Sequence, residues 1–272
     1  MSITKVNTGD IREAQKMRFT IPARIIMGML LAVLMISGSC KSSGQKKSSK
    51  NGFVKIFDGK TLNDWEGDPT YWRDENGSLV GEITPATLLK RNQFIIWRGG
   101  LTKDFELTLD FKITKDGNSG INYRSEELKD LQYALKGYQA DIDGANLYTG
   151  QNYEERARTT LAYRSEKIIV KEQNTRGPLE DHISNNAWTE RTVTGSLGNS
   201  DSLKTLVKSQ DWNKVHLIVK GNRLQHYIND VLMSEVTDND KVNGKSSGLL
   251  GMQVHVGPPM KVEFRNIRLK KL

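Results

Sequence analysis

The stretch DFELTLDFKIT, residues 104–114, decides the fold. Side chains two positions apart on a β-strand point the same way, so an alternation of apolar and polar residues predicts a strand with one buried and one solvated face. Five apolar residues alternate with polar ones along this stretch: Phe105, Leu107, Leu109, Phe111 and Ile113.

Comparable strand signals recur towards the C-terminus. The segment WNKVHLIVKGNRLQHYINDVLMSEV (212–236) contains two turn signals, Gly221-Asn222 and Asn229-Asp230, and predicts a meander of three antiparallel strands. His216 and His226 lie among apolar neighbours in this meander, and we interpret both as structural. Further β-like runs occupy residues 54–57, 93–97, 120–124, 159–170, 248–256 and 261–269.

These strands predict an all-β, two-sheet β-sandwich formed by a single domain over residues 53–272. No segment has a long helical period, and the 24 glycines favour many turns. In residues 261–269 the apolar positions change parity, which predicts a bulge near Arg265-Asn266. Residues 172–201 follow neither period and are predicted to form a long surface loop.

The N-terminal region has the pattern of an export signal. Residues 25–38, IIMGMLLAVLMISG, follow two arginines and precede Cys40. As a helix they would span only about 21 Å of a hydrocarbon core about 30 Å thick, so they predict a signal peptide rather than a membrane span. Small residues before Cys40 resemble a bacterial lipobox, although Ser37 stands where many lipoboxes carry Leu. We therefore expect an exported protein of a Gram-negative bacterium, anchored to a membrane by a lipid on Cys40.

A Lys/Ser-rich tether, residues 41–52, follows this signal, and its charges bear on partners and location. The chain carries a net charge of +8, of which residues 1–40 supply +3 and residues 41–50 supply +4, leaving +1 for residues 51–272. A nearly neutral body argues against a nucleic-acid partner. The tether has no acid-rich sorting signal, which favours the periplasm over display on the outer membrane.

A row of polar residues, GYQADIDG (137–144), indicates where chemistry could occur. On a strand, Gln139, Asp141 and Asp143 would share one face. The spacing does not fit an EF-hand, because Gly falls at position 4 from Asp141 and Asn152 at position 12. A less regular cation site remains open.

The same row resembles the carboxylate strand of concanavalin-like retaining glucanases, with one decisive departure. Gln139 stands where the nucleophilic Glu would lie, and an amide cannot form the covalent glycosyl intermediate that a retaining mechanism needs. Asp141 and Asp143, about 6.6 Å apart on one strand, could not readily flank both faces of a glycosidic bond. Ordinary glycoside hydrolysis is therefore disfavoured.

Across residues 52–272 the chain resembles the 3-keto-disaccharide hydrolase domain family, whose members are abundant in Bacteroidota. The motifs that carry the resemblance occur in order: FDGKTLNDWEG (57–67), GSLVGE (77–82), DFELTLDFKITKDGNSGINYR (104–124), GYQADIDG (137–144), YEERARTTLAYRSE (153–166) and GMQVHVGPPMKVEFRNIRLK (251–270). The resemblance implies a concanavalin A-like jelly roll. It also implies cleavage of glycosides already oxidised at C3, a substrate whose ketone acidifies the C2 hydrogen and permits elimination without a protein nucleophile.

This chemistry needs a base, an acid and donors facing an enolate oxygen. We expect Asp141 as the base, His255 as the acid, and Arg124 as the cation that stabilises the enolate. Glu154 is a further catalytic candidate from a loop over the rim. The expected substrate-binding residues are Asn122, Gln139, Asp143, Glu155, Arg156, Gln253 and Arg265.

Three alternatives remain open at this point. The cleft could be a non-catalytic, lectin-like sugar-binding module, or the site of an inverting glycosidase. No cofactor is required by the sequence, but a divalent cation could be held by Asp141, Asp143, Glu154 and His255 after folding. Four aromatic residues could stack on sugars, although we favour core positions for them: Trp65, Tyr71, Trp72 and Trp97.

Overall fold

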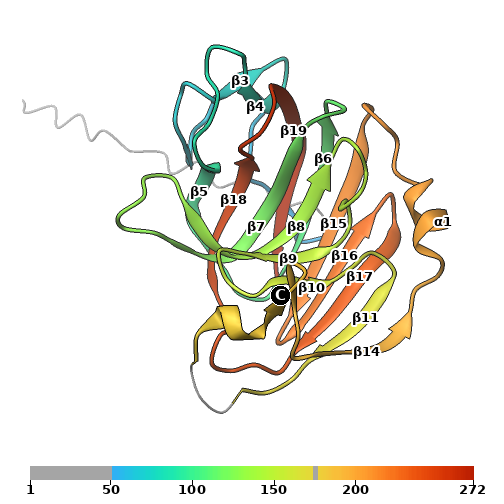
Figure 1. The fold of residues 1–272 in the computed structure, drawn as a ribbon. Coiled ribbons are helices and arrows are strands. Elements are labelled where there is room, and N and C mark those ends of the chain that lie inside the picture. Colours follow the sequence, from blue (N-terminus) through green and yellow to red (C-terminus); the bar gives the residue numbers. More distant parts are fainter. Residues whose placement is uncertain (1–50, 174–176) are drawn as a thin grey trace, which may run out of the picture. The chain divides into compact units, whose positions relative to one another are not determined.

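The computed structural model describes residues 51–173 and 177–272, which lie within one compact unit (Figure 1). The predicted export signal, Cys40 and residues 41–50 of the predicted tether lie outside the described residues, so lipidation and export stay predictions. The described residues form two packed β-sheets, here called sheet A and sheet B. The prediction of an all-β, concanavalin-like two-sheet sandwich is confirmed.

Sheet A has ten strands within the described ranges, and β1 (Val54–Lys55) pairs with β19 at its side. The other nine follow one another in the order β14 (Arg191–Ser196), β11 (Glu166–Val170), β17 (Val231–Asp238), β16 (Arg223–Ile228), β15 (Asn213–Lys220), β6 (Phe105–Ile113), β19 (Met260–Lys271), β4 (Ser78–Ile83) and β3 (Trp72–Glu75).

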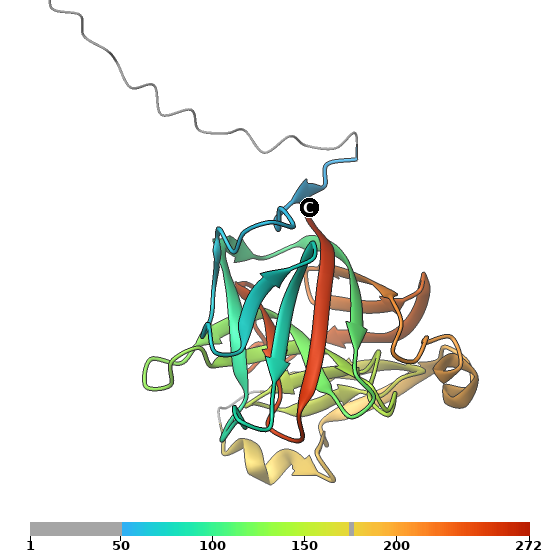
Figure 2. The same cartoon turned by 90° about the horizontal axis from the view of Figure 1, so that it is seen from above.

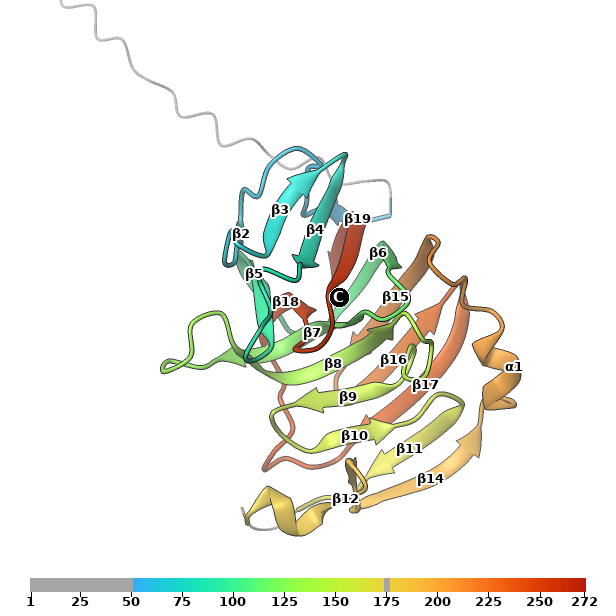
Figure 3. The same cartoon turned by 45° about the horizontal axis from the view of Figure 1, so that its top comes forward.

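Sheet B has nine strands within the same ranges. Their order is β12 (Ile183–Ser184), β13 (Ala187–Trp188), β10 (Thr159–Ala162), β9 (Asn152–Glu155), β8 (Leu135–Asp143), β7 (Asn118–Glu127), β18 (Gly248–Val254), β5 (Gln93–Thr102) and β2 (Trp65–Glu66). Figures 2 and 3 show the sandwich from two further directions, and in Figure 3 the strands β8, β9 and β10 lie in front of β16 and β17.

The core lies between the two sheets and follows the predicted alternation. In β6 every second residue, from Phe105 to Ile113, is buried, and the residues between them are partly exposed. The predicted bulge in β19 is also confirmed. The register shifts between Arg265 and Arg268, and Asn266 takes a φ of 56°. As a result, apolar residues of both parities in this strand reach the core.

The segment 172–201 differs from the predicted loop. It contains the 3₁₀-helix η1 (Leu179–His182) and the strands β12, β13 and β14, which extend both sheets at one end. The strands β12 and β13 have two residues each, too few to show a period, and they form by pairing with each other and with β10. The longer β14 pairs with β11. A short helix, α1 (Ser200–Lys204), follows, and neither helix of the described residues has the length to cross a membrane.

A buried ionic cluster joins the sheets near one end. The Arg158 side chain is fully buried, and its Nε lies 2.6 Å from Glu154 of β9. Its Nη2 lies 2.7 Å from Asp238 of β17, and its Nη1 lies 3.3 Å from Asp240. The Tyr138 hydroxyl donates to Asp238 over 2.5 Å. One guanidinium thus pairs with carboxylates from both sheets, and this fixes the position of one sheet relative to the other.

Candidate active site

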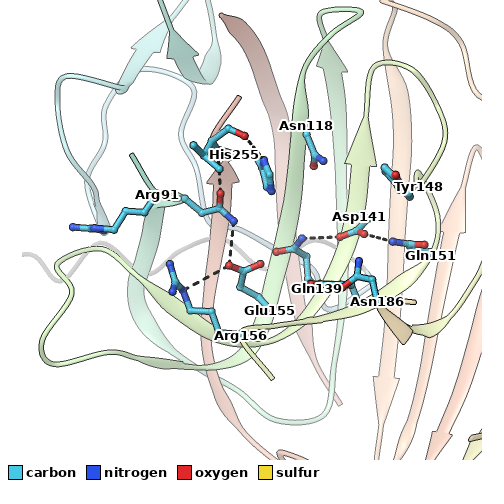
Figure 4. A pocket seen from close by; sticks show the side chains of 13 residues that line it. Arg91, Asn118, Gln139, Asp141, Tyr148, Gln151, Glu155, Arg156, Asn186 and His255 are labelled. Carbon is cyan, nitrogen blue, oxygen red and sulfur yellow. Dashed lines mark hydrogen bonds and ion pairs between the residues drawn. The ribbon is translucent and has the colours of Figure 1, made fainter. Parts of the chain in front are cut away.

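A cavity of about 530 Å³ opens on the face of sheet B that points away from the core (Figure 4). Its walls are polar and come from strands and loops far apart in the sequence. The lining residues are Arg91, Asn92, Asn118, Gln139, Asp141, Tyr148, Gln151, Tyr153, Glu155, Arg156, Asn186, His255 and Val256.

Strand β8 builds the floor of the cavity by simple alternation. Ala140 and Ile142 pack in the core. Gln139, which precedes Ala140, and Asp141, which lies between the two, therefore face the cavity. Gly120 of β7 lies opposite Asp141, and a Cβ there would come within 2.4 Å of the Gln139 side chain. A glycine at this position therefore leaves the space that Gln139 occupies.

Asp141 is a buried carboxylate held between two side-chain amides. Gln139 Nε2 donates to one oxygen over 2.6 Å, and Gln151 Nε2 donates to the other over 2.5 Å (Figure 4). Burial raises the pKa of Asp141 to about 7, although the two amide donors act in the opposite direction. A carboxylate with a pKa near neutrality can exchange a proton with a substrate at physiological pH.

Glu155, a second carboxylate in the cavity, lies in a different environment. Asn92 Nδ2 donates to it over 3.1 Å, Gln253 Nε2 over 3.3 Å, and the Arg156 guanidinium lies 3.7 Å away. Gln253 Nε2 also donates to Gln139 Oε1 over 3.2 Å. This bond fixes the orientation of the Gln139 amide, so that its nitrogen faces Asp141.

The opposite wall carries His255, which directly follows β18. Its Nδ1 lies 2.6 Å from the Val256 carbonyl oxygen. A carbonyl only accepts hydrogen bonds, so Nδ1 carries the proton and Nε2 is left for a ligand. Tyr148 and Asn186 complete the wall nearest Asp141, and the cationic side chains Arg91 and Arg156 lie on the other side (Figure 4).

A family model described as the 3-keto-alpha-glucoside-1,2-lyase-like domain matches residues 52–270. The chain belongs to this family. A 3-keto-disaccharide hydrolase of Bacteroides thetaiotaomicron is 36% identical over 92 residues, which cover 29% of this chain and 29% of that protein. The chain thus spans less than a third of that relative's length in this match.

Two solved structures of Parabacteroides distasonis proteins, both provisionally named glycosyl hydrolases, share the fold of this 3-keto-alpha-glucoside-1,2-lyase-like domain. The first is 18% identical with a TM-score of 0.50 and covers 81% of this chain and 99% of its own. The second is 17% identical, with the same TM-score of 0.50, and covers 82% and 94%. At this identity the likeness concerns the sandwich alone.

In this lyase-like domain the cavity brings together five of the residues singled out from the sequence: Gln139, Asp141, Glu155, Arg156 and His255. Gln253 is fully buried and reaches the cavity only through its bonds to Gln139 and Glu155. Asn122 lies on the expected face, opposite Gln139, but is fully buried and does not line the cavity.

The placement of Arg124 on the cavity face was wrong. The β7 register shifts after Tyr123, and Arg124 takes a φ of 46°, which turns its side chain away from the row that contains Asn122. Its guanidinium donates to the carbonyls of Lys103 over 2.7 Å and Gly221 over 2.8 Å. Arg124 therefore ties β7 to neighbouring loops and cannot stabilise an enolate in the cavity.

Glu154 was also placed wrongly. Residues 152–155 form a strand rather than a rim loop, so Glu154 points to the opposite side from Glu155 and pairs with Arg158 in the buried cluster. The alternation along β9 is the signal that could have separated the two glutamates. The same alternation places Tyr153 beside Glu155 on the cavity side.

Asp143 and Arg265 have structural rather than substrate-binding positions. The Asp143 carboxylate accepts the backbone N–H groups of residues 147, 148 and 149 over 2.7–2.8 Å, and so shapes the loop that carries Tyr148. Arg265 belongs to sheet A, where its guanidinium stacks 3.7 Å from the Trp212 ring and contacts Asp110.

These positions also bear on a divalent cation. Asp141, Asp143, Glu154 and His255 do not gather around one point, since Glu154 is in the inter-sheet cluster and Asp143 serves a loop. Among residues 51–173 and 177–272, no three His, Cys, Asp or Glu side chains are grouped to hold a metal ion.

Several cavity residues were missed in the sequence. Arg91, Asn92 and Asn186 come from irregular segments, where no periodicity indicates which way a side chain points. The expectation that four aromatic residues occupy the core is confirmed. Trp65, Trp72 and Trp97 are buried there, and Tyr71 packs against it. The aromatic residues of the cavity are instead Tyr148 and Tyr153.

Proposed function

We propose that the cavity cleaves 3-keto-glycosides by proton abstraction at C2, elimination of the C1 substituent and addition of water. The observation that carries the proposal is Asp141, a buried carboxylate whose pKa of about 7 suits a general base. Gln139 lies beside it where a retaining glycosidase would need a nucleophile. Membership of the 3-keto-alpha-glucoside-1,2-lyase-like family supports the same substrate class.

The steps balance with the groups that line the cavity. Asp141 takes the C2 proton, and the electron pair of the C–H bond delocalises towards the C3 carbonyl as an enolate. The enolate then expels the C1 oxygen, which receives the Nε2 proton of doubly protonated His255 on the opposite wall, while Nδ1 keeps its proton on the Val256 carbonyl. Water adds its hydroxyl to C1 and a proton returns to C2, so the net reaction is hydrolysis.

The enolate oxygen needs a positive or hydrogen-bonding partner, and Arg124 is not available for this role. Two cationic side chains do line the cavity, Arg91 and Arg156. Arg156 is our candidate, because its guanidinium also lies near Glu155 and is thereby oriented over the floor of the cavity.

Solvent exchange at C2 tests the proposal directly. We expect that a 3-keto-disaccharide incubated with the protein in deuterated water yields a monosaccharide product carrying deuterium at C2, as measured by NMR and mass spectrometry. The unoxidised disaccharide is the control and should remain intact, because its C2 hydrogen is not acidic. A folded protein that releases product without deuterium at C2, or shows neither cleavage nor exchange, would exclude this mechanism.

The pH dependence of the reaction should report the environment of Asp141. A base acts only when it is deprotonated, and burial raises the pKa of this carboxyl from its usual value to about 7. We therefore expect kcat/KM to rise with pH through an apparent pKa of about 7 on the acid limb of its profile. An exposed aspartate would place this limb near pH 4 (about 3.9), so a profile that is flat from pH 5 to 8 would contradict the role of Asp141.

A further inference from the structure

The segment between β8 and β9 forms hydrogen bonds to strands of sheet A, the other sheet of the sandwich. The Gly150 carbonyl oxygen accepts a hydrogen bond from Ser234 Oγ of β17 over 2.8 Å. The Gln151 carbonyl oxygen lies 3.2 Å from His226 Nδ1 of β16. Gly150 has a φ of 93°, and a Cβ there would come within 2.7 Å of the Met233 side chain, so the backbone lies directly on sheet A.

The direction of the His226 hydrogen bond follows from its partners. A carbonyl oxygen can only accept, so Nδ1 carries the proton. Burial lowers the pKa of His226 to about 4, so the ring is neutral and Nε2 must accept. The Tyr123 hydroxyl, 2.8 Å from Nε2, is its donor, and Tyr123 in turn accepts from Asn152 Nδ2 over 3.2 Å. This network fixes the tautomer that holds Gln151.

The same segment reaches the cavity from its other side. The Gln151 side chain donates through Nε2 to Asp141 over 2.5 Å. The Gly150 backbone N–H donates to the Asp141 carbonyl over 3.1 Å. The Gln151 carbonyl also accepts the Asp141 backbone N–H over 3.4 Å. One short piece of chain is therefore bonded both to sheet A and to Asp141.

We propose that His226 and Ser234 are positioning residues, which act from sheet A through the backbone of residues 150–151 to hold the Gln151 amide on Asp141. Their contribution to the reaction rests on the proposed function of Asp141 as the base. Neither residue lines the cavity, and the bonds to residues 150 and 151 are the route by which we expect each to affect Asp141.

The physical consequence is a change in the proton affinity of Asp141. Gln151 supplies one of its two side-chain donors, and a donor stabilises the charged carboxylate. The Glu155 and Asp143 carboxylates and the Gln139 amide also act on Asp141, and their own hydrogen bonds go to residues other than His226 and Ser234. Release of Gln151 should therefore raise the pKa of Asp141.

The test is a double-mutant cycle read out by the Asp141 carboxyl resonance in a ¹³C NMR titration without substrate. We expect His226→Phe, which keeps a ring but removes the donor, to raise the pKa of Asp141 by about 1. Gln151→Leu should raise it at least as much, and the double variant should match Gln151→Leu alone. Equal shifts that add in the double variant would overturn the proposal, because His226 would then act by another route.

Matched variants separate positioning from general damage. His226→Asn keeps a donor near the place of Nδ1 and should retain the original titration. His216→Phe, whose ring faces Glu106 on the solvent side of sheet A, should leave Asp141 unchanged. If His226→Phe does not fold, Ser234→Ala applies the same test, and no shift in that variant would likewise refute the inference.

The readout also separates this inference from the proposed function. The carboxyl titration needs no substrate, so a coupled shift would support the link from sheet A to Asp141 even if no 3-keto-glycoside is cleaved. Conversely, cleavage with deuterium at C2 but uncoupled shifts would leave the function standing and remove the role of His226 and Ser234.

Discussion

Replacement of Asp141 by Asn is expected to lower the rate of 3-keto-disaccharide cleavage by about 10²–10⁴-fold. The amide has almost the shape of the carboxylate but cannot take a proton from C2. The effect should appear in kcat/KM and in the rate of deuterium exchange at C2, both measured at pH 8, where Asp141 of the unmodified protein is ionised. Substrate binding, measured by calorimetry, should persist.

The matched control for this variant is Asp110→Asn. Asp110 belongs to sheet A and is bonded to Arg265 and Asn266, so the same chemical change there is remote from the cavity. We expect this control to cleave at the normal rate. If Asp141→Asn cleaves as fast as the control, Asp141 is not the base. If the unmodified protein binds the keto-sugar but never cleaves it, the cavity belongs to a lectin-like binding module.

Replacement of Arg158 by Leu is expected to lower the free energy of unfolding by about 3–5 kcal/mol. The guanidinium is fully buried and contacts Glu154, Asp238 and Asp240 at 2.6–3.3 Å. Its removal leaves three carboxylates close together in a region that excludes water, and a buried charge without a partner is costly. Urea denaturation followed by tryptophan fluorescence measures the change.

Arg265→Leu is the control for the Arg158 variant. Arg265 is partly exposed and pairs with Asp110 at 3.3 Å, so its loss should cost about 1 kcal/mol or less. If Arg158→Leu does not fold at all, Glu154→Gln offers a milder test, because it removes one charge and keeps the size of the side chain. Equal stabilities for the Arg158 and Arg265 variants would show that the cluster does not join the sheets energetically.

The long alternating strands allowed the fold to be predicted. In β6 and in the meander of β15, β16 and β17, the apolar residues repeat every second position over enough length to define a buried face. The bulge in β19 could be predicted for the same reason, since a change of parity is visible only in a long strand. The two-residue strands β12 and β13 have no period and could not be predicted.

The candidate site could be predicted where it lies on such a strand. Gln139 and Asp141 follow the alternation of β8 and line the cavity. The prediction that Arg124 faces the cavity was wrong because its positive φ reverses the side-chain direction within β7. Glu154 was placed wrongly because a rim loop was expected where β9 lies, and adjacent residues on a strand face opposite sides.

The sequence by itself determined the all-β class, the face on which Asp141 lies and the absence of a nucleophile at Gln139. These follow from local periodicity and residue type, which depend on near neighbours in the chain. Only the tertiary structure decided that His255, Glu155 and Asn186 surround Asp141, and that Arg158 and His226 connect the sheets. The residues around Asp141 lie from 14 to more than a hundred positions from it in the chain. Desolvation, which raises the pKa of Asp141, arises only when those segments pack together.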